Sequence, residues 1–201
     1  MKIICIEGNY SSSESALGLI TEPVFFLKPE SSVLRNSLPF FIPDHTQQII
    51  PRCNIVLNIC RLGKNIRKKF SNIYYDEIGI GIDMEAADLL EKCKAASLPW
   101  ESAKAYDNSS PIGNFIPVKE IKDIGNIPFS IFKNNLCIAS ENTSKLIHDF
   151  GDIIEHVTKF MTIKTGDLIF TGSPPLKETV RINDHIDCFI GDKKMLSFNV
   201  K

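Results

Sequence analysis

The sequence lacks the features that would mark it as a nucleic-acid-binding, membrane-spanning or zinc-binding protein. Its 23 basic and 24 acidic residues leave a formal net charge of -1, so the charge balance favours neither nucleic acid nor an acidic membrane as a partner. No apolar run approaches the roughly 20 residues that cross a bilayer. The six cysteines form no C-x-x-C motif, and no pair of histidines has zinc-binding spacing.

The chain is nevertheless long and apolar enough for a substantial core. Its 201 residues, 43% of them hydrophobic, are typical of one globular domain, which we expect over residues 1–201. The apolar run before Glu7 is too short for a signal peptide and predicts a first strand. We interpret the cysteines as reduced and mostly buried thiols, which favours a cytoplasmic location.

The most informative stretch runs from Ile78 to Gly113. Isoleucines and glycines alternate up to Ile82, which predicts a buried strand whose bare face lies close to another element. Asp83 is expected to end that strand and to cap a helix over residues 84–96. Lys104 follows in a stretch that we expect to be a polar loop. From these residues alone, an N-cap and a solvated lysine are the favoured interpretation, and a functional site is the alternative.

Other segments have clear periodicities. Alternation predicts a strand over residues 49–59 on which Arg52 and Asn54 point to the same face. Asn134 and Asn135 predict a hairpin turn, and an apolar stripe predicts a helix over residues 144–160. Further strands are expected over residues 2–7, 23–29, 38–43, 168–171, 180–182, 186–190 and 195–200. Taken alone, Lys28 would be a surface lysine at a strand end.

Several motifs also occur in the order found in a known family. A strand leads into Asp83, and the chain then carries Ala86, Asp88, Leu89, Trp100, Ala103, Lys104, Asp107, Pro111 and Gly113. On these motifs the chain resembles the fumarylacetoacetate hydrolase family over nearly its whole length. The resemblance implies an α+β fold that is mostly β, a barrel-like rolled mixed sheet with two principal helices. It also implies that Lys104 is a catalytic residue and Asp83 a metal ligand.

The first motif of the family is only partly present. Asn9 and Tyr10 match it, but Ser13 and Ala16 stand where the family has a histidine that activates water and a glutamate that orients the histidine. Neither replacement accepts a proton near neutral pH, so the general base is missing. Ser13 as a nucleophile would need an adjacent base, and only Glu14 is near it in sequence.

The expected metal site departs further from the family. Arg52 and Asn54 stand where the family has two glutamates that bind a divalent metal together with the aspartate equivalent to Asp83. Three carboxylates suit a hard cation such as Mg²⁺, whereas one carboxylate, an amide and a guanidinium do not. We therefore expect no cofactor and an empty position at Asp83. Glu85 is either a substitute ligand or, as we favour, an exposed residue of a first helical turn.

Four more positions belong to the expected pocket. Ala87 replaces an arginine of the family and Leu90 a glutamine that reaches the substrate. Gly172 and Ser173 resemble the loop that lines the family's pocket, but Leu176 replaces its second glycine, and a Cβ there restricts the backbone.

The resemblance implies cleavage of carbon–carbon bonds in 2,4-dioxo acids such as acylpyruvates, or related decarboxylation or isomerisation. Because the metal ligands and the base are largely replaced, the leading hypothesis is an inactive protein or one that uses the old pocket to bind a small 2-oxo acid. The alternative is an active hydrolase, decarboxylase or isomerase with Mg²⁺ or Mn²⁺. The family also implies a homodimer, and a third hypothesis is a structural partner of an active relative.

One further expectation concerns the charge that replaces the metal. The guanidinium of Arg52 can donate two parallel hydrogen bonds to a carboxylate. We therefore expect Arg52 to pair with Asp83, with Asn54 donating a third hydrogen bond.

Overall fold

Two sheets form the framework of the chain in a computed structural model, which describes residues 1–10, 21–35 and 37–201. The larger sheet is mixed, because β1 runs parallel to β9 and β3 parallel to β6 while the other neighbours are antiparallel. Its strand order is β2 (Val24–Lys28), β1 (Ile3–Glu7), β9 (Leu168–Phe170), β4 (Ile49–Ile59), β5 (Tyr75–Ala86), β6 (Ser110–Pro117) and β3 (Val33–Leu34).

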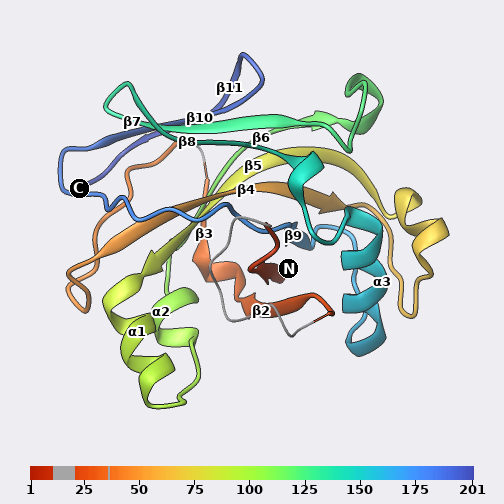
Figure 1. The fold of residues 1–201 in the computed structure, drawn as a ribbon, viewed down its shortest axis with the longest axis horizontal. Helices are drawn as coiled ribbons and strands as arrows, with labels where there is room; N and C mark the ends of the chain where they lie inside the picture. The colour runs from red at the N-terminus through yellow and green to blue at the C-terminus, as the bar shows by residue number, and fades with distance from the viewer. Residues whose placement is uncertain (11–20, 36) are drawn as a thin grey trace.

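The smaller sheet covers one side of the larger one (Figure 1). Its order is β11 (Lys193–Asn199), β10 (His185–Ile190), β7 (Pro128–Lys133) and β8 (Leu136–Asn142), with antiparallel neighbours throughout. Strands β7 and β8 form the predicted hairpin, and Asn134 and Asn135 have φ of 51° and 67° as the turn requires.

The helices lie at the two ends of this framework: α1 (Ala87–Ala95) and α2 (Glu101–Lys104) at one end and α3 (Phe150–Phe160) at the other (Figure 1). Short 3-10 helices span Glu30–Ser32, Lys68–Ile73, Val118–Glu120 and Thr143–Lys145. The predicted fold class is confirmed: a mostly β protein with a rolled mixed sheet and two principal helices, α1 and α3. No helix in the described ranges is long and apolar enough to span a membrane.

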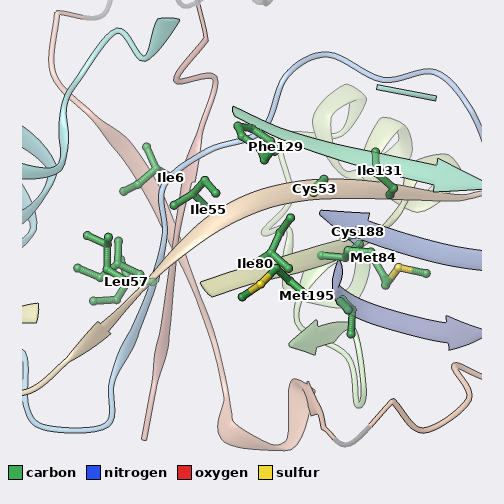
Figure 2. Close-up of a cluster of buried hydrophobic side chains, with 14 of the residues drawn as sticks. Ile6, Cys53, Ile55, Leu57, Ile80, Met84, Phe129, Ile131, Cys188 and Met195 are labelled. Atoms are coloured by element: carbon green, nitrogen blue, oxygen red, sulfur yellow. The ribbon is translucent and has the colours of Figure 1, made fainter. Parts of the chain in front are cut away.

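The core fills the space between the sheets. Figure 2 shows Ile55 and Ile80 of the larger sheet in the same buried cluster as Ile131 and Cys188 of the smaller one. Strands β4 and β5 are cross-strand neighbours with Ile55 opposite Ile80. A second cluster, which includes Ile3, Val56 and Phe170, packs on the opposite face of the larger sheet. Both faces of the central strands are therefore buried.

The glycines of β5 lie where the sequence predicted a close approach. A Cβ on Gly81 would lie 2.7 Å from the ring of Phe170, and one on Gly79 would lie 2.9 Å from the carbonyl oxygen of Asn114. The bare backbone therefore lets neighbouring elements pack against this strand.

Four predicted elements are corrected by the structure. Residues 38–43 and 180–182 make only single bridges, Phe40 with Val200 and Val180 with Ile49. The helix expected over residues 84–96 begins at Ala87, and the one expected over residues 144–160 begins at Phe150. Asp149 sets the second boundary, since its side chain accepts a hydrogen bond from the Asp152 N–H while the Asp152 carboxylate accepts one from the Asp149 N–H.

Candidate functional site

The candidate site forms where β5 approaches its end. Asp83 and Glu85 are two residues apart on this strand, so both carboxylates point to one face of the sheet. The strand continues to Ala86 because residues 83–86 pair with β4, with Asp83 opposite Arg52 and Ala86 opposite Ile49. Asp83 therefore does not cap α1, whose N-cap residue is Ala86. Glu85 is buried rather than exposed in a first helical turn.

Two lysines from other elements reach these carboxylates. Lys28 ends β2, and Lys104 ends the short helix α2 rather than lying in a polar loop. Their side chains are 0% and 1% exposed, which is rare for lysine unless the charge is paired. Sequence periodicity alone indicated a surface role for both residues, and the structure contradicts that interpretation.

Five charged residues form a continuous chain of ion pairs that runs from Lys28 to Arg52. Lys28 Nζ lies 2.7 Å from Asp83 Oδ1, and Lys104 Nζ lies 2.8 Å from Asp83 Oδ2. Lys104 Nζ also lies 2.6 Å from Glu85 Oε2. The Arg52 Nη2 group lies 2.9 Å from the other oxygen, Glu85 Oε1. Each carboxylate is thus shared between two cations.

A third carboxylate lies beside this chain. Glu7, at the end of β1, has its Oε2 atom 3.5 Å from Lys104 Nζ. We call the six residues Glu7, Lys28, Arg52, Asp83, Glu85 and Lys104 the ion cluster. With three acidic and three basic members it has no formal net charge, which reduces the cost of burying so many charges.

The ion cluster determines which of its members ionise. Burial alone would raise the pKa of Asp83, but Lys104 and Lys28 lower that pKa from 3.8 to about 2. Burial also opposes ionisation of Glu85, whose pKa Lys104 and Arg52 nevertheless lower. Burial acts against the charge of Lys104, but the carboxylates around it raise the pKa of its ammonium. Both acids are therefore carboxylates and Lys104 is an ammonium at neutral pH, which makes Asp83 and Glu85 weak bases.

Arg52 has a different partner from the one we expected. It binds Glu85 instead of Asp83, and its Nη1 donates to the carbonyl oxygen of Leu176 at 3.1 Å. Asp83 lies directly opposite Arg52 in the sheet, but two lysines already engage its oxygens. The longer arginine reaches the diagonal neighbour. The prediction of an Arg52–Asp83 pair was therefore wrong.

Asn54 likewise forms hydrogen bonds with backbone groups instead of with Asp83. Its amide nitrogen donates to the carbonyl oxygen of Arg52 at 2.8 Å, and its amide oxygen accepts from the Gly172 N–H at 3.0 Å. Gly172 has φ of 110°, and a Cβ there would lie 2.7 Å from Asn9 Cβ. Asn54 therefore fixes the loop after β9 against β4. Ser173 follows on this loop and is half-buried.

The remaining predicted pocket residues are dispersed. Tyr10 is buried in the core, Leu90 packs in that core from α1, and Ala87 is half-buried at the first position of α1. Ser13 lies outside the described residues. The structure thus brings Asp83, Arg52 and Lys104 into one cluster and leaves Leu90 as a packing residue.

Two members of the ion cluster, Glu7 and Lys28, were not among the predicted site residues, and Glu85 was considered only as a substitute metal ligand. Lys28 stands in the segment Phe26-Leu27-Lys28-Pro29, which resembles a Phe-x-Lys-Pro motif of the same family, and that motif was the available signal for it. Glu85 follows Asp83 by two residues, which is a signal only if residues 83–86 are recognised as strand. Glu7 ends a buried strand and gives no further sequence signal.

The described residues do not fit a divalent metal as they stand. The carboxylates of Asp83 and Glu85 suit a hard cation by chemistry, but each is shared between two cationic side chains. Across the described ranges, no group of three or more His, Cys, Asp or Glu residues is placed to hold an ion.

Comparisons with known proteins connect this geometry to a family. The sequence model described as fumarylacetoacetate hydrolase C-terminal matches residues 2–200. The chain is 33% identical to the mitochondrial oxaloacetate decarboxylase of Dictyostelium discoideum, over 94% of this chain and 88% of that protein. It is 29% identical to the mitochondrial oxaloacetate tautomerase of Mus musculus, over 99% and 91%.

A solved structure has the same fold. The fumarylpyruvate hydrolase from Pseudomonas aeruginosa, in complex with Mn²⁺ and pyruvate, superposes with a TM-score of 0.92 at 24% identity, covering 100% of this chain and 89% of that chain. The expectation of no cofactor is contradicted by this comparison, because a protein of this fold was solved with a divalent metal. The match over residues 2–200 and the identity to the Dictyostelium protein show that the chain belongs to the fumarylacetoacetate hydrolase family.

Proposed function

We propose that this chain binds a small 2-oxo acid of the oxaloacetate kind beside the ion cluster, and that it turns such an acid over far more slowly than an ordinary enzyme. The names of the relatives, an oxaloacetate decarboxylase and oxaloacetate tautomerases, support the ligand class. The slow turnover is inferred from the Lys104 ammonium, whose Nζ lies 2.8 Å from Asp83 Oδ2 and 2.6 Å from Glu85 Oε2.

The chemistry of 2-oxo acids explains why this arrangement favours binding over turnover. Tautomerisation needs a base that takes a proton from carbon and a positive charge that stabilises the enolate oxygen. The ion cluster contains the positive charge in Lys104. It lacks a good base among its buried acids, because the lowered pKa values of Asp83 and Glu85 make them poor proton acceptors. Loss of a general base typically costs roughly two to four orders of magnitude in rate.

The second candidate function is an active decarboxylase, tautomerase, isomerase or C–C bond hydrolase. The specific observation in its favour is the 33% identity to an oxaloacetate decarboxylase across 94% of the chain. It would require a proton acceptor beyond the ion-paired carboxylates.

The two candidates are separated by measuring binding and turnover on the same protein. Calorimetry should detect binding of freshly dissolved oxaloacetate, and Lys104→Gln should weaken that binding if the variant remains folded by circular dichroism. Enol absorbance and pyruvate formation, with Mg²⁺ or Mn²⁺ added, should stay near the buffer rate. Turnover on the order of 1 per second would establish the second candidate instead. Absence of any binding would refute the proposal.

Assembly and location form part of the same proposal. We propose a homodimer, supported by the family resemblance, and a cytoplasmic location, supported by six cysteines that are all free thiols. A role as the structural partner of an active relative would appear as co-purification with that relative. Neither nucleic acid nor a membrane is proposed as a partner.

A further inference from the structure

Arg52 is the cation of the ion cluster that an incoming anion meets first. Its side chain is 23% exposed, whereas those of Lys28 and Lys104 are 0% and 1% exposed. The two lysines are also occupied by Asp83 and, for Lys104, by Glu85. A carboxylate that approaches from solvent therefore encounters a guanidinium before it encounters either ammonium.

The guanidinium is held in place with hydrogen-bonding capacity to spare. One terminal nitrogen donates to Glu85 and the other to the carbonyl oxygen of Leu176. A guanidinium has five N–H donors, so these two bonds leave three that no other hydrogen bond among the described residues engages. Because both anchors fix its orientation, little side-chain entropy remains to be lost when a ligand binds.

The free N–H donors of Arg52 lie where the carboxylate of a ligand could bind. On the strand pairing, Arg52 lies directly opposite Asp83, and the proposed 2-oxo acid binds beside the same cluster. A guanidinium recognises a carboxylate with two parallel hydrogen bonds. A monocarboxylate such as pyruvate has one carboxylate to offer, whereas oxaloacetate has a second one at the far end of a short chain.

We infer that Arg52 is a specificity-determining residue that binds the second carboxylate of a 2-oxo dicarboxylic acid. This inference rests on the proposed function, since it assumes that a 2-oxo acid binds beside the ion cluster. It goes further by naming the side chain that distinguishes a dicarboxylic acid from a monocarboxylic one. Arg52 touches the ligand and takes no part in proton transfer.

The test compares two acids that differ by one carboxylate. Calorimetry on the full chain, with Mg²⁺ present throughout, measures freshly dissolved oxaloacetate and pyruvate. The wild-type protein should bind oxaloacetate about tenfold more tightly or better. Arg52→Gln should weaken oxaloacetate by roughly tenfold to a hundredfold and change pyruvate by less than about twofold. Arg61→Gln, which removes an exposed arginine, serves as the matched control and should change neither affinity.

The outcomes separate this inference from the proposed function. If the wild-type protein binds both acids and Arg52→Gln weakens both equally or neither, Arg52 does not recognise the second carboxylate, although the proposed function stands. If the wild-type protein binds neither acid, both fail. Should Arg52→Gln not fold, Arg52→Lys keeps the charge but removes the planar fork, and it should likewise weaken oxaloacetate selectively.

Discussion

Among single side chains, Asp83 couples the stability of the fold to pH. Lys104 and Lys28 overcome the effect of burial and lower its pKa from 3.8 to about 2. The folded protein therefore prefers the carboxylate, and this contribution to stability is fully present above pH 3.8. It is lost as the pH falls toward about 2. We expect urea unfolding to show a loss of stability over this range that is smaller in Asp83→Asn.

The comparison needs both proteins at each pH, since other carboxylates titrate in the same range. The difference in unfolding free energy between wild type and Asp83→Asn should shrink as the pH falls from 3.8 toward 2. A difference that stays constant through this range would contradict the assigned ion pairs.

Replacement of a buried lysine tests the ion cluster more directly. Lys28→Met removes the partner of Asp83 Oδ1 and leaves that buried oxygen without its cation. Breaking a buried pair in this way costs about 3–5 kcal/mol. Lys68→Met is the matched control, because Lys68 pairs with Asp149 and Asp152 but is 48% exposed, and its loss should cost less than about 1 kcal/mol. Equal effects of the two substitutions in chemical denaturation would show that the ion cluster contributes little.

Sequence reasoning identified some of these side chains and missed the pairing of others. Asp83 and Lys104 were chosen because family motifs contain them, and the structure brings them within 2.8 Å. The partner of Arg52 could not be predicted, since it depends on Lys28 occupying an Asp83 oxygen and on Glu85 lying in a strand. Both facts depend on tertiary packing rather than on local pattern.

At the level of helices, the N-terminus of α3 offers a clean test. Asp149 accepts a hydrogen bond from the Asp152 N–H at 2.9 Å, and that bond satisfies a donor that the first helical turn leaves free. Asp149→Ala should lower the unfolding free energy by about 0.5–2 kcal/mol. Asp149→Asn, which keeps an accepting oxygen, should lower it much less in the same thermal or urea unfolding measurement. Equal losses would point to the Lys68–Asp149 pair instead of the cap.

The two helix boundaries show why periodicity overestimates helix length. Leu146 and Ile147 continue the apolar stripe of α3, but the Leu146 backbone bridges to Tyr10 and the Ile147 N–H donates to Asn9. Residues 84–86 fit a helical stripe equally well, yet they pair with β4 and lie in the sheet. In both cases a distant segment competes for the backbone, and a local pattern contains no information about that segment.

For the protein as a unit, the fold class was predictable because motifs in a fixed order identify a family, and the family fixes the architecture. The mixed sheet with β1 parallel to β9 joins segments far apart in sequence, which periodicity alone does not predict. The extent of the domain, residues 1–201, stays a prediction.

The oligomeric state also stays a prediction and is open to a direct test. We expect a homodimer in sedimentation velocity experiments, on the basis of the family resemblance. The sedimentation coefficient should not fall on dilution through the micromolar range. A single monomeric species of 22.6 kDa at micromolar concentration would contradict this expectation.

The ion cluster has a consequence for the lifetime of the folded state. Its members come from β1, β2, β4, β5 and α2, so its charges meet only after segments distant in sequence have assembled. Contacts of this kind tend to form after the rate-limiting step of folding, and interactions absent from that transition state act mainly on the rate of unfolding. Loss of Lys28 should therefore speed unfolding while leaving the rate of refolding nearly unchanged. The ion cluster thus prolongs the lifetime of the native state by slowing its unfolding.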